Sequence, residues 1–263
     1  MSLKSLVLQS APEFLLIRMK ARRYCRLLRH LPMDEEPEFA PIPPLLKEGD
    51  GAVDVGANFG IYTRLLSNLV GAEGEVHSFE PVIHTYRVLL SCLARLDVAN
   101  VKAYPLALSD RRGEGLMKCP SYRDGGGNYY QSFVAEGKKL GSPGQEFTVP
   151  LRCMDDALPE NTKPIRFIKI DVEGHELPVA HGARRTLEKW KPALLIEVSR
   201  NPDDPESSTG ELFAFLASLG YEPYWISPGG LVRREKAVRS VNYFFFTEDH
   251  VRTLRKAGHL AGD

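Results

Sequence analysis

The fold of this chain is decided by the stretch Val53-Asp54-Val55-Gly56-Ala57-Asn58-Phe59-Gly60, in which an apolar strand runs into a glycine turn. A segment of helical character, residues 61–70, follows Gly60. Glycine lets the backbone bend tightly and lets a ligand approach without a Cβ in the way. The N–H groups at the start of a helix can bind a carboxylate or a phosphate. The pattern therefore indicates a nucleotide-like ligand at the first strand–helix crossing.

Strand-like and helix-like segments alternate along the chain beyond this turn. Strands are expected at 52–55, 76–79, 101–108, 167–172 and 193–198, and helices at 61–70, 86–96 and around 180–190. This alternation predicts parallel βαβ units and a doubly wound α/β sheet with helices on both faces. After a helix at 211–219, two strands at 221–226 and 242–247 have no helix between them, which predicts a terminal antiparallel hairpin.

Composition changes divide the chain into two parts. Residues 1–44 form a basic helical segment followed by a proline-rich connector, and residues 45–263 form the main domain with an insertion at about 109–149. We interpret Asp124–Tyr130, which contains three consecutive glycines, as a mobile loop that covers an acceptor substrate, with a disordered surface loop without function as the alternative. The basic segment has three interpretations: packing across the domain, a lid over the active site, or contact with a membrane or with phosphates.

The composition also argues against several classes of protein. Lys and Arg total 34, as do Asp and Glu, so no overall charge attracts the chain to nucleic acid and no such partner is expected. The cysteines Cys25, Cys92, Cys119 and Cys153 form no CxxC pair and have no His at zinc spacing. We expect reduced thiols, a cytoplasmic protein and no metal site. No apolar run approaches the ~20 residues that span a bilayer, so no transmembrane segment is expected.

Glu80 ends the second strand in Ser78-Phe79-Glu80-Pro81. At that place a carboxylate can accept hydrogen bonds from both hydroxyls of a ribose, as an acid does in dinucleotide-binding folds. The glycine spacing in this chain is G-x-x-x-G rather than G-x-G-x-x-G, which counts against a nicotinamide-dependent dehydrogenase. The glycine turn and Glu80 together favour a ribose-bearing ligand.

Five motifs resemble the FkbM family of S-adenosylmethionine-dependent methyltransferases. They are Val53–Gly60, Phe79-Glu80-Pro81, Leu106-Ala107-Leu108-Ser109-Asp110, Ile168-Lys169-Ile170-Asp171-Val172-Glu173-Gly174 and Leu194-Leu195-Ile196-Glu197, within about residues 50–226. The fourth motif is much more specific than the glycine turn. The resemblance implies a Rossmann-like class I methyltransferase fold, which is a seven-stranded, mostly parallel sheet with an antiparallel last strand. It also implies S-adenosylmethionine as cofactor and a hydroxyl of a small molecule or saccharide as methyl acceptor.

The same resemblance implies roles for individual residues. The methionine end of the cofactor would be lined by Asp54, Gly56, Ala57, Asn58 and Gly60, and Glu80 would hold the ribose. Ser109 and Asp110 would lie beside the adenine, with Asp110 as an acceptor for its amino group. A plain turn residue is the alternative for Asp110.

Acidic and imidazole side chains follow the next two strands: Asp171, Glu173, His175 and Glu176 after the fourth, and Glu197 at the end of the fifth. The carboxyl ends of strands face the ligand crevice in an open α/β sheet. We predict that Asp171 borders the transferring methyl group and that His175 or Glu197 takes the acceptor's proton. The alternatives are solvent or substrate contact for His175, structural hydrogen bonding for Glu173, and a divalent ion shared by Asp171 and Glu197.

The function predicted from these patterns is an S-adenosylmethionine-dependent O-methyltransferase. Two alternatives stay open: a nucleic-acid methyltransferase that binds through the basic N-terminal segment, and a cofactor-binding module without catalysis. The patterns specify neither the acceptor nor the oligomeric state.

Overall fold

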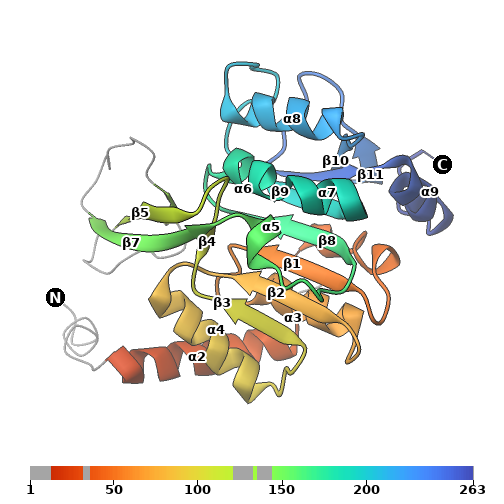
Figure 1. Cartoon of the computed structure of the whole chain (residues 1–263). Helices are drawn as coiled ribbons and strands as arrows, with labels where there is room; N and C mark the ends of the chain where they lie inside the picture. Colours follow the sequence, from red (N-terminus) through yellow and green to blue (C-terminus); the bar gives the residue numbers. More distant parts are fainter. Residues whose placement is uncertain (1–12, 32–35, 121–132, 135–143, 263) are drawn as a thin grey trace.

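An eight-stranded sheet organises the part of the chain that the computed structural model describes, residues 13–31, 36–120, 133–134 and 144–262 (Figure 1). Its strands are β1 (Gly51–Val55), β2 (Glu75–Phe79), β3 (Val101–Tyr104), β8 (Ile165–Ile170), β9 (Ala193–Glu197), β10 (Glu222–Ser227), β11 (Gly230–Arg233) and β12 (Asn242–Phe246). Their order is β11-β10-β12-β9-β8-β1-β2-β3. The five strands from β9 to β3 are parallel, and β12 is antiparallel to both β9 and β10. The predicted doubly wound sheet with a reversed late strand is therefore confirmed.

The sheet has one strand more than the seven that the resemblance implied. The turn between Ser227 and Gly230 leads into β11 rather than directly into β12, and β11 pairs antiparallel with β10 at the edge. Gly230 has φ +115°, a left-handed conformation that favours glycine. The predicted hairpin partners β10 and β12 do pair, with β11 inserted between them along the chain.

Helices cover both faces of the large sheet (Figure 1). They are α2 (Glu13–Arg29), α3 (Ile61–Val70), α4 (Ile83–Arg95), α5 (Met154–Ala157), α6 (Glu176–Gly182), α7 (Arg184–Trp190), α8 (Ser208–Ser218) and α9 (Glu248–Lys256), with short 3-10 turns at Pro37–Phe39 and Pro43–Leu45. All of β1 is buried, as expected for a central parallel strand. Its Val53 and Val55 pack in the core with α6 and α8, whereas Ala52 packs in the core with α3, so the two faces of β1 serve two apolar layers.

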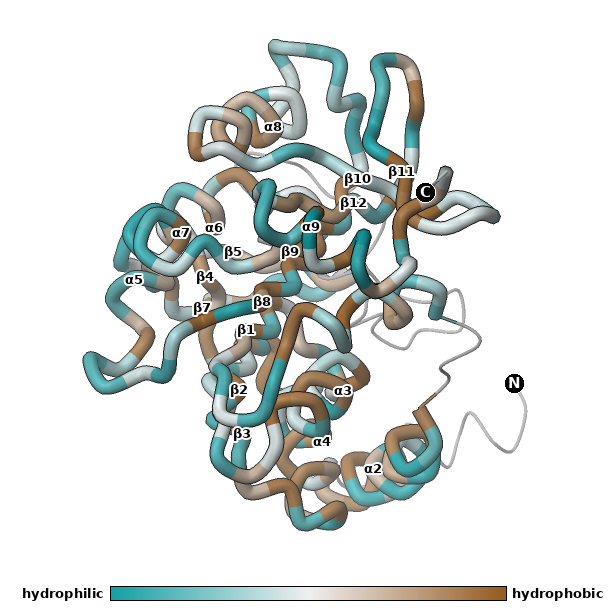
Figure 2. Tube along the Cα trace, turned by 90° about the vertical axis from the view of Figure 1, so that its right-hand side faces the viewer, coloured by the Kyte–Doolittle hydropathy of each residue, from teal (hydrophilic) through white to brown (hydrophobic). Residues whose placement is uncertain are grey.

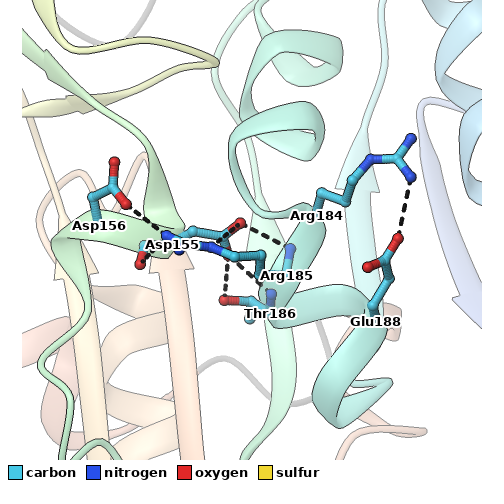
Figure 3. A network of polar contacts seen from close by, with 6 residues as sticks. All are labelled: Asp155, Asp156, Arg184, Arg185, Thr186 and Glu188. Carbon is cyan, nitrogen blue, oxygen red and sulfur yellow. Dashed lines mark hydrogen bonds and ion pairs between the residues drawn. The ribbon is translucent and has the colours of Figure 1, made fainter.

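The single helix predicted after the fourth strand consists of two helices, α6 and α7. A Cβ at Gly182 would lie 1.9 Å from the backbone oxygen of Ser109, so the glycine permits a close approach where the first helix ends. Asp155 accepts hydrogen bonds from the backbone N–H groups of Arg185 at 2.8 Å and Thr186 at 2.9 Å (Figure 3). These groups have no partner within the helix, so Asp155 supplies α7 with a cap of its own.

The insertion expected at about 109–149 contains regular structure, for which the sequence patterns predicted no strands. A second sheet is formed by β4 (Ala107–Leu108), β5 (Gly113–Pro120), β6 (Phe133–Val134) and β7 (Gly144–Arg152), in the order β4-β7-β5-β6. The antiparallel ribbon of β5 and β7 extends along their whole length. The strand predicted at 101–108 is divided between β3 and β4, because Pro105 lacks an N–H group for the ladder. The predicted acceptor loop Asp124–Tyr130 lies outside the described residues.

The helix α2 packs across α4. Its Ala21, Cys25 and Leu28 share a buried cluster with Val88 and Cys92 of α4. For the inner face of α2, this contact fits the first interpretation of the basic segment, which is packing across the domain. None of the four cysteines, all of which lie in the described ranges, forms a disulfide. Within the described ranges, no helix has the length and apolar character needed to cross a bilayer.

Candidate functional site

A cleft lies where the carboxyl ends of β1, β2 and β8 meet the smaller sheet. Its walls are formed by Val55, Gly56, Asn58, Phe79, Glu80, Pro81, Val82, Leu106, Ala107, Leu108, Met117, Asp171, Val172, Glu173 and His175. The empty space inside it, open solvent included, is about 600 Å³. The cleft is partly open to solvent, and both polar and apolar residues line it.

The glycine turn forms one end of the cleft because it is held tightly against two neighbouring strands. The backbone N–H groups of Gly56 and Ala57 both donate to the carbonyl oxygen of Phe79, at 2.9 and 3.0 Å. Gly56 has φ +77°, and a Cβ there would lie 1.9 Å from the backbone oxygen of Asp171. A side chain at this position would collide with the end of β8. The glycine predicted for ligand approach is therefore also required by packing.

Glu80 is held in the cleft by the backbone. Its Oε2 accepts the N–H of Asn58 and its Oε1 accepts the N–H of Val82, both at 2.9 Å. The residue is 6% exposed, and burial raises the pKa of its carboxyl to about 7. Each carboxylate oxygen can accept more than one hydrogen bond, so both retain acceptor capacity. A fixed carboxylate of this kind can accept the two neighbouring hydroxyls of a ribose.

Asn58 provides a direct indication that the cleft takes a polar ligand. Its Oδ1 is buried and has no hydrogen-bond partner among the described residues. An unsatisfied buried acceptor costs about 1–3 kcal/mol, so such atoms are uncommon without a function. The opposite wall is apolar, because Pro81, Val82, Leu106, Leu108 and Met117 line it and suit a flat base. A ribose acceptor, an orphaned polar atom and an apolar slot together fit S-adenosylmethionine.

Asp171 borders the cleft and is oriented by a buried lysine. The Nζ atom of Lys169 lies 2.8 Å from Oδ2 of Asp171, and the side chains are 8% and 31% exposed respectively. Burial would lower the pKa of Lys169, but the charges of Asp171 and Asp54 outweigh it and raise that pKa. Lys169 therefore stays charged between two carboxylates.

Asp54 lies beneath α3 rather than in the cleft. It is in register with Lys169 on the neighbouring strand, and its Oδ2 accepts the hydroxyl of Thr63 at 2.6 Å. The Thr63 hydroxyl lies 2.9 Å from that of Ser78. Burial raises the pKa of the Asp54 carboxyl, because the residue is only 1% exposed. We call Asp54, Thr63, Ser78 and Lys169 the polar layer.

His175 lines the cleft and contacts one of the residues predicted beside the adenine. Its Nε2 lies 2.9 Å from Oγ of Ser109, and that hydroxyl donates to Oδ1 of Asp110 at 3.1 Å. The Ser109 hydroxyl has a single proton, so the Nε2 of His175 is the donor in their contact. Asp110 also pairs with Arg111 at the surface. The three predicted residues thus form a chain of hydrogen bonds from the cleft to solvent.

Glu197 is adjacent to the cleft but does not line it. It borders a neighbouring hollow that Arg200 and Arg239 also line. Burial, followed by the negative charge of Asp171, raises the pKa of Glu197 to about 7. Burial and the charge of Asp171 also raise the pKa of Glu173. Asp171 therefore influences both the cleft and the adjoining hollow.

The sequence-predicted residues divide into two groups. Gly56, Asn58, Glu80, Asp171 and His175 line the cleft, whereas Asp54, Ala57, Gly60, Ser109, Asp110 and Glu197 do not. Glu176 has a structural place: its Oε1 accepts the N–H of Gly174 at 2.6 Å. In the described part of the chain, no three His, Cys, Asp or Glu side chains are grouped so as to hold a metal ion.

Sequence reasoning missed two features of the site. The first is Lys169, for which the signal was a lysine inside an otherwise apolar strand. The second is the apolar wall, to which the small sheet contributes Leu108 and Met117. Leu108 is part of a motif already quoted, whereas no pattern around Met117 indicated that its strand closes a cleft.

Comparison with known proteins assigns the chain to a family. The sequence model of the methyltransferase FkbM domain matches residues 54–223. The chain belongs to the FkbM methyltransferase family. This membership confirms the predicted family and the Rossmann-like methyltransferase fold. It also confirms the predicted class of enzyme, a methyltransferase.

Solved structures that are similar to this FkbM protein have low sequence identity to it. A methyltransferase FkbM from Methylobacillus flagellatus has a TM-score of 0.48 and 19% identity, over 77% of this chain and 44% of that one. A putative rRNA methylase from Clostridium thermocellum has a TM-score of 0.49 and 12% identity, over 80% and 91%. A SAM-dependent O-methyltransferase from Thermotoga maritima has a TM-score of 0.41 and 14% identity, over 80% and 63%. The chain thus spans less than half the length of the first structure, and no curated protein matches it significantly.

Proposed function

We propose that this FkbM protein transfers a methyl group from S-adenosylmethionine to a hydroxyl oxygen of a small molecule or saccharide. The observation that carries the proposal is the carboxylate pair at the carboxyl ends of β8 and β9. Asp171 is fixed by Lys169, and the neighbouring Glu197 has a pKa of about 7. A base with a pKa near the working pH is well suited to accept the proton of an alcohol.

The cofactor would be held by residues on three sides of the cleft. Glu80 would accept the two ribose hydroxyls, and the orphaned Oδ1 of Asn58 would accept a donor at the amino-acid end. Leu106 and Met117 would contact the base. When bound, S-adenosylmethionine supplies a methyl group on a positively charged sulfur. Asp171 and Glu173, which line the same cleft, would supply negative charge on the side of that group.

The acceptor would be oriented by Asp171 and deprotonated by Glu197. Lys169 occupies one oxygen of Asp171, which leaves the other able to accept the acceptor's hydroxyl group. Glu197 borders the open hollow, so a proton that it takes can pass to solvent. Fixing the hydroxyl in one orientation removes much of the entropy cost of reaction. His175 is the second candidate base, but its contact with Ser109 favours a place on the adenine side.

The first experiment identifies the acceptor. Purified protein is incubated with methyl-labelled S-adenosylmethionine and a fractionated cell extract, and mass spectrometry locates the label. We expect the label as an O-methyl group on a small molecule or a saccharide. Label found only in RNA would overturn the proposed acceptor class, and no labelled product in any fraction would favour a binding module without catalysis.

The second experiment separates the two bases. Glu197→Gln should lower kcat by roughly 100-fold or more and remove its rise with pH near 7, while the affinity for S-adenosylhomocysteine stays unchanged. His175→Gln should retain the pH profile. Normal turnover of Glu197→Gln across pH would remove Glu197 as the base, and loss of the profile in His175→Gln would assign the role to His175.

A further inference from the structure

The exposed apolar side chains of this protein are concentrated on two packed helices. Among the described residues, eight large apolar side chains are exposed, and six of them belong to α2 and α4: Phe14, Leu15, Met19, Leu27, Ile83 and Leu90. Phe14 is 70% exposed and Met19 is 52% exposed. Figure 1 shows α2 as the outermost element on this side of the molecule, lying across α4. Scattered apolar residues are ordinary on a surface, but a concentration on one layer indicates a contact.

The same layer is strongly basic. The helix α2 contains Arg18, Lys20, Arg22, Arg23, Arg26 and Arg29 against a single acid, Glu13, although the whole chain has a net charge of zero. Arg22, Arg26 and Arg29 line one hollow together with Arg95 of α4. No ion pair joins these four arginines to any described carboxylate. They therefore form an open site for an anion.

The inner face of α2 is fixed, so this outer surface has a defined shape. The Cys92 thiol lies 3.7 Å from the carbonyl oxygen of Ala21, and Lys20 Nζ lies 3.1 Å from His84 Nε2. Tyr24 stacks on Phe59, with the ring centroids 3.9 Å apart. Phe59 follows Asn58 in the chain, so the helix is attached directly to the wall of the cleft. We use the name α2–α4 surface for the exposed apolar side chains Phe14, Leu15, Met19, Leu27, Ile83 and Leu90 together with the four arginines of the hollow.

We propose that the α2–α4 surface docks on a lipid bilayer that contains anionic lipids. Figure 2 shows apolar and polar positions interspersed along α2 at this edge of the molecule. Interfacial helices combine arginines that bind headgroup phosphates with apolar side chains that enter the headgroup–acyl boundary by about 5–10 Å. The arginine hollow would receive a lipid phosphate, and Phe14 and Met19 would enter the boundary. A nucleic-acid backbone would satisfy the arginines but would leave these apolar side chains in water.

The test is binding of the full chain to vesicles. Co-sedimentation is measured with phosphatidylcholine vesicles and with mixed phosphatidylcholine–phosphatidylglycerol vesicles. We expect binding to the mixed vesicles only, weakened by salt. The triple variant Arg22→Gln/Arg26→Gln/Arg29→Gln should bind them more than tenfold more weakly. The variant Phe14→Ser/Met19→Ser, whose charge is unchanged, should bind the mixed vesicles about tenfold more weakly.

Matched controls make the outcome decisive. Arg112→Gln/Arg200→Gln/Arg239→Gln removes the same charge from other exposed arginines, and Leu116→Ser/Val241→Ser removes the two exposed apolar side chains found elsewhere. Both controls should bind as the unmodified protein does, and circular dichroism checks that every variant is folded. The proposal fails if the unmodified protein does not bind the mixed vesicles. It also fails if the control triple variant loses as much affinity for them as Arg22→Gln/Arg26→Gln/Arg29→Gln does. It also fails if RNA binds more tightly than the vesicles and Phe14→Ser/Met19→Ser has no effect.

Discussion

The polar layer and the cleft both bury carboxylates, but the two regions satisfy them differently. In the polar layer, Oδ2 of Asp54 accepts the hydroxyl of Thr63 and the residue lies beside Lys169, whereas its buried Oδ1 has no hydrogen-bond partner among the described residues. In the cleft, Glu80 is held by two backbone N–H groups, and Asn58 keeps an acceptor without a partner. Burial raises the pKa of both acids. The two regions therefore differ in what holds the acid: side chains contact Asp54 in the polar layer, whereas backbone groups hold Glu80 in a cleft that is open to a ligand.

The largest expected effect is a loss of stability when Lys169, the cation that contacts carboxylates of both regions, is replaced. Lys169→Met would leave Asp54 and Asp171 without their positive partner. Breaking a buried ion pair in this way costs about 3–5 kcal/mol of the free energy of unfolding, which denaturant titration measures. The control Lys102→Met, which removes an exposed partner of Glu75, should cost less than about 1 kcal/mol. Equal losses in the two variants would show that Lys169 does not connect the regions.

The next prediction concerns two variants that should affect ligand affinity and stability in opposite ways. Glu80→Gln should weaken S-adenosylhomocysteine binding by roughly 100-fold, since charge-assisted hydrogen bonds are lost, and should not lower the free energy of unfolding near pH 7, because the neutral amide carries no buried charge. Asp54→Asn should do the reverse, with about 2 kcal/mol of stability lost and little change in affinity. Calorimetric titration and thermal unfolding measure both quantities. If Asp54→Asn loses as much affinity as Glu80→Gln, then Asp54 acts on the cofactor, as the sequence predicted.

The pH dependence of stability provides a third comparison. In the ligand-free protein the pKa of Glu80 is about 7, above the ordinary 4.5, so between these values the folded state binds more protons than the unfolded state. The free energy of unfolding should therefore fall as the pH rises from about 4.5, by about 3 kcal/mol from this group, and should level off above pH 7. The fall should be smaller in Glu80→Gln. Glu197→Gln should reduce it less, because Glu197 is only partly buried. A pH profile unchanged in Glu80→Gln would contradict the burial of a charged group there.

The smallest effects are expected away from both regions, in the contacts of α7 (Figure 3). Asp155→Ala removes the acceptor for the N–H groups of Arg185 and Thr186, and should cost about 1 kcal/mol. Arg184→Ala breaks an exposed pair with Glu188, and should cost less than about 0.5 kcal/mol. Thermal unfolding resolves the difference. A larger loss from Arg184→Ala would show that surface charges, rather than the helix cap, fix α7.

Local patterns were sufficient where one segment forms a feature by itself. The turn from Val55 into Gly56 and the acid at the end of β2 were predicted, because strand, glycine and carboxylate are adjacent in the chain. The pairing of Asp54 with Lys169 was not, because it depends on the register of β1 against β8, which periodicity does not specify. The same reason explains why the contact of His175 with Ser109, which are 66 residues apart, was missed.

The second sheet was missed for a different physical reason. Its strand β7 buries only Val149 and Leu151 completely, and the partner strand β5 includes Gly113 and Gly115, which carry no side chain to show an alternating pattern. Glycine-containing strands have weak periodicity and depend on their partner for stability. A ribbon of this kind is recognised from its pairing, which is a property of two distant segments.

The shared walls of the cleft have a consequence for the behaviour of the whole molecule. Met117 belongs to one sheet and Asp171 to the loop after the other, so a nucleoside bound in the cleft would add contacts to both sheets, beside those that Leu108 and Val82 already make between them. Any ligand that binds only this arrangement stabilises it by mass action, by about 2.7 kcal/mol at a concentration one hundred times its dissociation constant. The supply of methyl donor would thus determine how rigidly the outer ribbon is attached, as well as how fast the reaction proceeds.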